Sequence, residues 1–233
     1  DYDNVMHLSV ENHVALGTRV IAAPLVNDLP PGFVKLPSSE VIEFDPAIGE
    51  QKLKNNVFLV EKYHGMDNGR ITCMFGPQAT DMCSLELLRE CYSLAQKYNV
   101  GIHMHVAQSK REDTQMEMRY GKRTIPFLEE QGMLVPNMLA AHMTCATEEE
   151  LVTVARSGVS MVLCTNSIAI LGGAIPPAET FMKYSDRLAL GSDQSPGNNC
   201  NNMFNEMKFT SILHKVKNND PTVFPAWKVL RMP

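Results

Sequence analysis

The sequence predicts an α/β fold and, within that class, a (β/α)8 TIM barrel. Segments typical of strands and of helices alternate six times along the 233 residues, which is the pattern of parallel βα units. Polar residues with catalytic chemistry follow several of the strands, as they do at the carboxyl face of such a barrel. A Rossmann fold is disfavoured, because no glycine-rich turn follows the first strand and Gly172-Gly173 precedes no phosphate-binding loop.

The first part of the chain is predicted to contain two helices and one strand. The apolar pattern from Asn4 to Leu16 ends at Gly17, a residue typical of helix C-termini. The run from Arg19 to Val26 is strand-like, and a proline-rich loop follows from Asn27 to Pro37. The segment from Ser38 to His64 is predicted to be mostly helical, since its apolar residues form a stripe.

The centre of the chain carries two predicted strands around one helix. Ile71 to Phe75 is predicted as a strand, and Ser84 as the N-cap of the helix after it. In the strand from Gly101 to Val106, alternation places His103 and His105 on one face. Two imidazoles on one face suit a metal ion, although a hydrogen-bonded interior pair would give the same pattern.

After a polar loop, the last part is predicted to contain three strands and four helices. The strands are recognised by short apolar runs, and one helix by the N-cap Thr147, its acidic first turn and the stop at Gly158. In chain order these elements are a helix at 126–131, a strand at 138–143, a helix at 147–157, a strand at 159–164, a helix at 178–184, a strand at 188–192 and a helix at 201–215.

Composition narrows the class of protein. The length and a hydrophobic content of 44% allow one large domain, and we expect residues 1–233 to form it. No apolar run approaches the roughly 20 residues of a membrane span, and the first residues resemble no signal peptide. A net charge of −5 disfavours nucleic acid as a partner. We therefore expect a cytoplasmic enzyme or binding protein for small molecules.

Cysteine and basic residues carry no predicted chemistry. The six cysteines are scattered without a C-x-x-C pair, so we interpret them as reduced thiols and assign none to a metal or to nucleophilic catalysis. Lys122-Arg123 and Lys215 with Lys217 are interpreted as solvated surface.

Three polar residues at strand ends form the candidate site. His105, His142 and Asp193 are separated by 37 and 51 residues, so only a fold that gathers strand ends can use them together. Imidazole and carboxylate are ligands for zinc or iron, and a carboxylate beside the ion can accept a proton from water. Taken singly, His142 is compatible with a structural strand histidine, and Asp193 with a helix cap.

These residues stand in stretches that resemble the amidohydrolase superfamily. The closest likeness is to the cytosine and guanine deaminase-like branch, which includes S-adenosylhomocysteine deaminases and triazine chlorohydrolases. The stretches that carry the resemblance are A-L-G-T-R at 15–19, G-I-H-M-H-V-A-Q-S at 101–109, L-A-A-H-M at 139–143, V-L-C-T-N-S-I-A-I-L-G-G-A-I-P-P at 162–177, and L-A-L-G-S-D at 188–193 with the N-M-F-N-E-M helix after it.

The resemblance implies a role for each polar residue. It implies that His105 binds the metal and that His142 polarises the substrate or the hydrolytic water. Asp193 is implied to bind the metal and to act as general base. His103 matches a variable position and is expected to support the site without binding the ion. The implied cofactor is one divalent ion, zinc with iron as the alternative, and the implied substrate is a small nitrogen heterocycle such as a purine, pyrimidine or triazine.

Several positions depart from the family pattern. Gln108 stands where the family usually has a glutamate that shuttles a proton to a ring nitrogen. Glutamine can bind the substrate through a hydrogen bond but cannot relay its proton. The loop Cys164-Thr165-Asn166-Ser167-Ile168 also replaces the usual Cys-Pro-x-Ser-Asn.

The pattern also predicts an incomplete barrel. The family's first strand ends in His-x-His, and this sequence holds no second His-x-His. Its six strands correspond to strands three to eight, without strands one and two and without the family's small β-sandwich. Six strands leave open edges, so the chain made alone is expected to bind metal weakly, to be inactive and to aggregate or form homo-oligomers.

Three functions fit these observations. The leading one is metal-dependent hydrolytic deamination, or displacement of a similar group, on a nitrogen heterocycle. The alternative is a non-catalytic relative that has lost the metal chemistry, as Gln108 and the missing ligands would allow. A metal-free enzyme for phosphorylated substrates is disfavoured by the lack of a glycine-rich phosphate loop.

Overall fold

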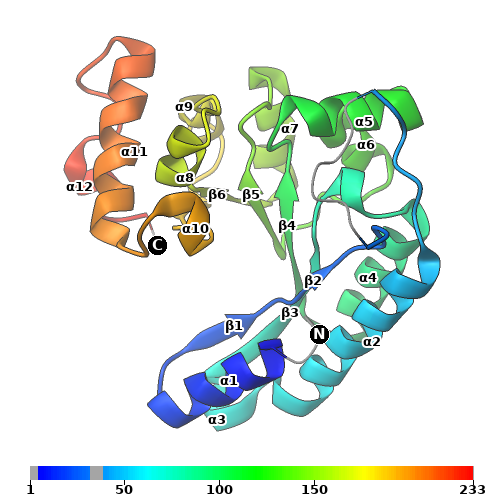
Figure 1. Cartoon of the computed structure of the whole chain (residues 1–233). Coiled ribbons are helices and arrows are strands. Elements are labelled where there is room, and N and C mark those ends of the chain that lie inside the picture. Colours follow the sequence, from blue (N-terminus) through cyan, green and yellow to red (C-terminus); the bar gives the residue numbers. More distant parts are fainter. Residues whose placement is uncertain (1–4, 32–38, 233) are drawn as a thin grey trace. The chain divides into compact units, whose positions relative to one another are not determined.

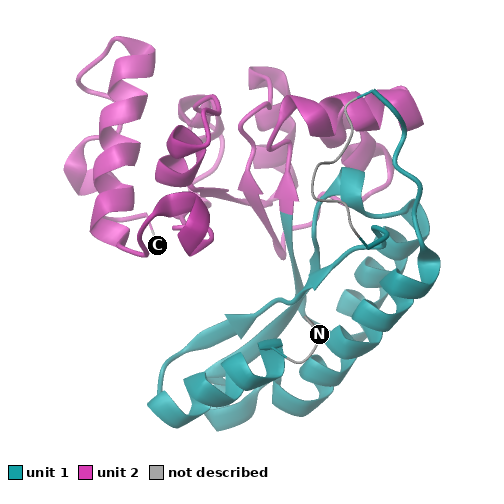
Figure 2. Ribbon diagram, in the orientation of Figure 1, with its two compact units in different colours: residues 1–104 teal, residues 105–233 magenta. Residues whose placement is uncertain are grey.

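The computed structural model describes residues 5–31 and 39–232. The chain divides into two compact units, residues 1–104 and 105–233, with the boundary inside one strand (Figure 2). Both units are built from helices and parallel strands (Figure 1), which confirms the α/β class. Among the described residues, no helix is both long and apolar enough to cross a bilayer.

The first unit is organised around its third strand. Strand β3 (Ile71–Pro77) pairs in parallel with β1 (Val20–Ala22), β2 (Leu25–Val26) and β4 (Gly101–Val106). Its side chains Ile71, Cys73 and Phe75 are buried. The helices of this unit are α1 (Val5–Leu16), α2 (Pro46–Tyr63), α3 (Met66–Gly69) and α4 (Leu85–Tyr98), with a 3-10 turn at Thr80–Met82. Helices α2 and α4 pack against β3 and against each other.

Local chemistry explains where the elements of the first unit begin and end. The predicted strand from Arg19 to Val26 is two short strands, since Pro24 between them has no N–H to donate. Gly76 lets β2 and β3 approach, because a Cβ there would lie 2.5 Å from the Pro24 carbonyl oxygen. The predicted N-cap Ser84 accepts the Leu87 N–H at 3.2 Å.

The prediction of a helix from Ser38 was wrong in its first part. Asp45 caps α2 by accepting the Ala47 N–H at 3.0 Å, and Pro46 follows at the first helical position, where it is favoured. Residues 39–45 are not helical. Residues 32–38, which include most of the predicted proline-rich loop, lie outside the described part of the chain.

The second unit contains the end of β4 and three further strands. Strand β6 (Ser160–Leu163) lies between β5 (Met138–His142) and β7 (Leu188–Leu190), and all three are parallel. The helices of this unit are α5 (Lys110–Tyr120), α6 (Thr124–Glu130), α7 (Glu148–Ser157), α8 (Thr165–Ile170), α9 (Ala178–Phe181), α10 (Ser195–Asn198), α11 (Met203–Asn218) and α12 (Ala226–Val229). Its core includes Met138, Met161 and Leu151, each fully buried.

One prediction for the second unit was correct and another was wrong. Thr147 and Glu150 form the capping box at the start of α7, and Gly158 ends that helix with φ +83°, as predicted. The stretch between Val106 and Pro126 was predicted as a polar loop, but it contains α5 and the start of α6. Each unit consists of parallel βα elements, which are the building units of the predicted incomplete (β/α)8 barrel.

Candidate metal centre

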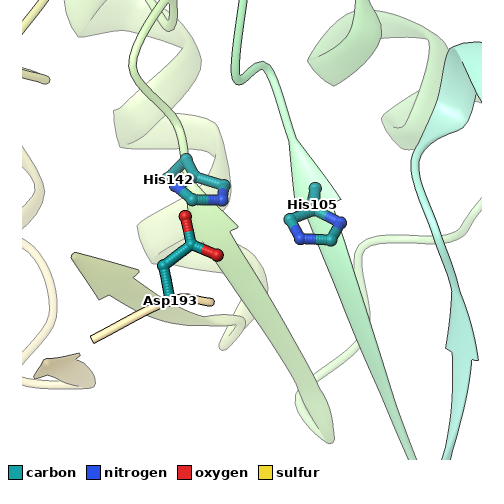
Figure 3. Close-up of side chains that lie close together, drawn as sticks. All are labelled: His105, His142 and Asp193. Carbon is teal, nitrogen blue, oxygen red and sulfur yellow. The ribbon is translucent and has the colours of Figure 1, made fainter. Parts of the chain in front are cut away.

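Three side chains of the second unit meet at the ends of its strands. His105 lies on β4, His142 is the last residue of β5, and Asp193 follows β7 by three residues. One ligand atom from each residue lies within 4.8 Å of those of the other two. In Figure 3 the Asp193 carboxylate points toward the two imidazoles. The expectation that strand ends bring these residues together is therefore confirmed.

Parallel pairing explains why residues so far apart in the sequence converge. Carboxyl ends of parallel strands lie at one edge of a sheet, and here Leu163 at the end of β6 is in register with Leu190 of β7. The loop after β5 lies along the loop after β4. In that contact Met143 N–H donates to the Val106 carbonyl at 2.9 Å.

The backbone at these strand ends takes a conformation that side chains disfavour. The φ angles of Ala107, His142, Met143 and Asp193 are +48°, +75°, +52° and +60°. Left-handed φ at non-glycine residues costs on the order of 1–3 kcal/mol each and collects at functional sites. Four such residues after the strands β4, β5 and β7 indicate that the fold holds His142 and Asp193 in place against a local preference.

The two histidines share one side of the site. Their rings are stacked, with centroids 5.2 Å apart and planes 10° from parallel. His142 is buried and His105 is half-buried. His103, the other histidine of the strand, is exposed and does not belong to the group of three.

The donor set fits a divalent ion. Two imidazoles and a carboxylate are the usual donors to zinc, and three protein ligands are typical of catalytic zinc sites. Two metal–ligand bonds of about 2.1 Å span up to about 4.2 Å, slightly less than the 4.8 Å limit that encloses the three atoms. The spacing of the three atoms is therefore close to what one ion requires of its ligands, and His105 and Asp193 are the two residues expected to bind it.

Hydrogen bonds hold both oxygens of the Asp193 carboxylate. Ser167 Oγ donates to Oδ2 at 2.7 Å, and the Gln194 backbone N–H donates to Oδ1 at 2.7 Å. Each oxygen keeps a further lone pair for an ion or a proton. The contact with Ser167 was not predicted, although the loop that carries Ser167 had been noted as atypical.

Gln108 lies in the short loop between β4 and α5. Its backbone N–H donates to Glu112 Oε2 at 2.7 Å, and the Ala107 N–H donates to Glu112 Oε1 at 2.9 Å. Thr124 Oγ1 adds a hydrogen bond to Glu112 at 2.8 Å. Glu112 thus fixes the loop between His105 and α5. The pattern Ser109-x-x-Glu112, which is typical of a helix start, could have revealed this role of Glu112 from the sequence. The role of Gln108 in substrate binding stays a prediction.

The loop after His142 is braced by an ion-pair cluster. Arg123 donates to the Cys145 carbonyl at 2.6 Å, to Glu150 Oε1 at 2.8 Å and to Asp113 Oδ2 at 2.7 Å. Burial raises the pKa of Asp113, and the charge of Arg123 partly offsets this. The interpretation of Arg123 as solvated surface was wrong, because the guanidinium is held by three groups of the second unit.

The chain is similar in sequence to proteins named as deaminases. The chain is 34% identical over 190 residues to a 5-methylthioadenosine/S-adenosylhomocysteine deaminase of Caldanaerobacter subterraneus, a match that covers 82% of this chain and 44% of the relative. It is 34% identical over 184 residues to a 5′-deoxyadenosine deaminase of Methanosarcina barkeri, covering 79% and 43%. The chain thus spans less than half the length of these relatives.

A solved structure extends the likeness to the fold. The structure of an adenosine deaminase from Xanthomonas campestris with bound zinc superposes with a TM-score of 0.85 at 25% identity. The superposition covers 97% of this chain and 48% of that one. The model of the amidohydrolase family matches residues 2–232. The chain belongs to the amidohydrolase family.

Proposed function

We propose that the chain carries a metal-dependent hydrolase site that displaces an amino group, or a similar leaving group, from a nitrogen heterocycle. The observation that carries the proposal is the convergence of His105, His142 and Asp193, whose donor atoms lie within 4.8 Å of one another. Family membership supports it, as do the deaminase names of the relatives. The proposed cofactor is zinc, which one solved relative binds, with iron as the alternative.

Each residue of the site has a proposed role. His105 and Asp193 bind the ion, whose chemical contribution is to lower the pKa of a water molecule so that it attacks near neutral pH. Asp193 accepts the proton that the attacking water loses and delivers it to the leaving amino group. His142 polarises the substrate or orients the water. The balance is one water consumed, one C–N bond broken, one C–O bond formed and one ammonia released.

Gln108 limits which substrates fit this scheme. Its amide can donate to or accept from a ring nitrogen, but it carries no exchangeable acid proton to relay. We therefore propose substrates whose ring nitrogen or leaving group obtains its proton from elsewhere. Amino-substituted purines remain the first class to test, because the relatives are named for adenosine derivatives.

The proposal also covers the domain, its assembly and its cellular compartment. We propose that residues 1–233 act as one partial hydrolase domain on a small-molecule substrate and associate into homo-oligomers. The cytoplasm is the proposed compartment, because all six cysteines are free thiols.

A non-catalytic relative is the second candidate. One observation favours it, namely Gln108 in place of the expected glutamate. Such a protein would keep the pocket and bind a heterocycle without converting it.

The experiment that tests the proposal supplies zinc in excess and follows ammonia release from 5′-methylthioadenosine. A parallel assay adds free imidazole to complete the coordination of the ion, because the chain alone is expected to bind metal weakly. The expected result is ammonia release when zinc and imidazole are both supplied, none from the chain without these additions, and none from Asp193→Asn under either condition. Asparagine is close in size and tolerates left-handed φ. Zinc-loaded chain that binds a heterocycle but releases no ammonia in either assay would favour the second candidate.

A further inference from the structure

A buried carboxylate of the second unit lies outside the group of three residues that forms the candidate metal centre. Glu206 is on α11 and is only 1% exposed. Its Oε1 accepts the backbone N–H of Asn166 at 3.0 Å, and its Oε2 accepts Asn198 Nδ2 at 3.3 Å. These two asparagines are themselves buried. Helix α8 packs against both α10 and α11, so the carboxylate sits where three helices of the second unit meet (Figure 1).

The partners of Glu206 belong to the two short helices that contact the segment of Asp193, namely α8 and α10. Asn166 immediately precedes Ser167, whose hydroxyl donates to Asp193 Oδ2 at 2.7 Å. Asn198 donates its side chain to the carbonyl of Ser192, the residue before Asp193. Asn166 Nδ2 also donates to the Asn198 carbonyl at 3.1 Å. Glu206 is therefore linked to Asp193 by two routes that combine hydrogen bonds with one step along the backbone. One runs through Asn166 and its neighbour Ser167 to the Asp193 carboxylate, and the other through Asn198 to the carbonyl of Ser192, the residue before Asp193.

Burial of the Glu206 carboxylate costs free energy. A buried carboxylate loses its hydration, and neutral N–H donors replace that hydration only in part. Burial raises the pKa of the Glu206 carboxyl, although the Asn166 and Asn198 hydrogen bonds lower it in part. Asp193 meanwhile needs support, because its φ of +60° is disfavoured. Residues that orient metal ligands typically change metal affinity or activity by about 10–100-fold when they are mutated.

We infer that Glu206 is a positioning residue of the metal centre. It ties helix α8, which follows β6, to helix α10, which follows β7, and so fixes the direction of the Asp193 carboxylate, acting through Asn166, Ser167 and Asn198. The inference deepens the proposed function and rests on it, since it takes Asp193 as a metal ligand. Glu206 itself touches neither the ion nor the substrate.

The test compares Glu206→Gln with a matched control, Glu179→Gln. Glutamine at 206 keeps the shape but turns one acceptor oxygen into a donor amide that faces an N–H group. Glu179 also forms a hydrogen bond with α11, between its Oε1 and His214 Nδ1 at 2.6 Å. This bond involves neither α8 nor α10. Cobalt(II) is the probe, because its visible absorption reports ligand geometry as well as affinity.

The two variants are expected to differ in metal binding and not in stability. Both should lower the midpoint of thermal unfolding by several degrees. Glu206→Gln alone should weaken cobalt binding by about 10-fold or more and change the absorption bands. Glu206→Asp, which keeps both acceptor oxygens, should restore part of the affinity. Equal cobalt affinity and unchanged bands in Glu206→Gln would overturn the inference.

Ser167 provides a second route to the same conclusion. Ser167→Ala should weaken cobalt binding, Ser167→Thr should retain it, and the double variant with Glu206→Gln should lose less than the sum of both effects, because the two residues act in series. If Glu206→Gln does not fold, full cobalt affinity in Ser167→Ala overturns the inference. If Asp193→Asn binds cobalt as tightly as the unaltered chain, the proposed function fails. If only Asp193→Asn loses cobalt, the inference alone fails.

Discussion

The imidazole rings of His105 and His142 stack at 5.2 Å although the two residues come from different strands. Their surroundings differ, since His105 is half-buried on β4 and His142 is buried with a left-handed backbone at the end of β5. Stacking places both rings beside Asp193, yet the proposed roles are distinct. His105 binds the ion, and His142 acts on the substrate or water.

Changing each histidine should separate these roles. His105→Ala should reduce cobalt affinity by more than the 10–100-fold typical of supporting residues. His142→Asn, chosen because asparagine tolerates positive φ, should keep the affinity but reduce turnover by about 10²–10⁴-fold. Cobalt titration and ammonia release measure the two quantities. Equal loss of cobalt in both variants would show that His142 is a third ligand.

Gln108→Glu should change chemistry more than stability. A glutamate at this position can relay a proton, so turnover of amino-substituted heterocycles should rise by about 10²-fold or more, while the midpoint of urea unfolding stays nearly constant. Turnover of a chloro-substituted triazine serves as the internal comparison, because its leaving group needs no proton. An unchanged preference between the two substrates would argue against a role for Gln108.

Glu112→Gln should destabilise the second unit. The carboxylate accepts three hydrogen bonds around the loop after β4, and hydrogen bonds to charged groups contribute about 1.5–3 kcal/mol each. We expect a loss of about 2–3 kcal/mol in the free energy of unfolding, measured with urea. The control is Glu117→Gln on the exposed side of α5, with an effect within about 0.5 kcal/mol. Equal losses in the two variants would show that Glu112 has no particular structural role.

Buried thiols should resist labelling near neutral pH. Burial raises the pKa of Cys73 to about 11 and that of Cys83 to about 12, from an ordinary value of 9.0. The thiolate is the reactive form, so labelling of both should be slow at neutral pH and accelerate as the pH rises toward these values. Cys200 is half-buried and should react first. Mass spectrometry after timed alkylation reports the order, and early labelling of Cys83 would contradict it.

Much of the fold followed from local sequence patterns. Alternation identified β4, and the capping box of Thr147 and Glu150 fixed the start of α7. The three residues of the candidate site were predicted to lie together because each stands at or just past the end of an apolar strand. Helix α5 was missed because its buried face includes Glu112, Asp113 and Gln115. A helix that buries polar groups through hydrogen bonds shows no clear apolar stripe.

The residues that support the site could not be predicted from sequence patterns. Ser167 and Asp193 are 26 residues apart, and Asn166 and Glu206 are 40 apart. No periodicity links such pairs, so only the packing of α8, α10 and α11 reveals that they meet. The same holds for Arg123, whose partner Glu150 lies 27 residues away. A basic pair in a polar stretch, such as Lys122-Arg123, gives no sign of such a partner.

A crystal structure of the zinc-soaked chain would show whether His105 and Asp193 bind one ion, as we propose. Anomalous scattering at the zinc absorption edge locates the ion without reference to any assumed site. The account predicts one strong peak at about 2.0–2.2 Å from a His105 nitrogen and an Asp193 oxygen. A zinc peak elsewhere in the molecule, with these two side chains bound only to protein atoms, would contradict it.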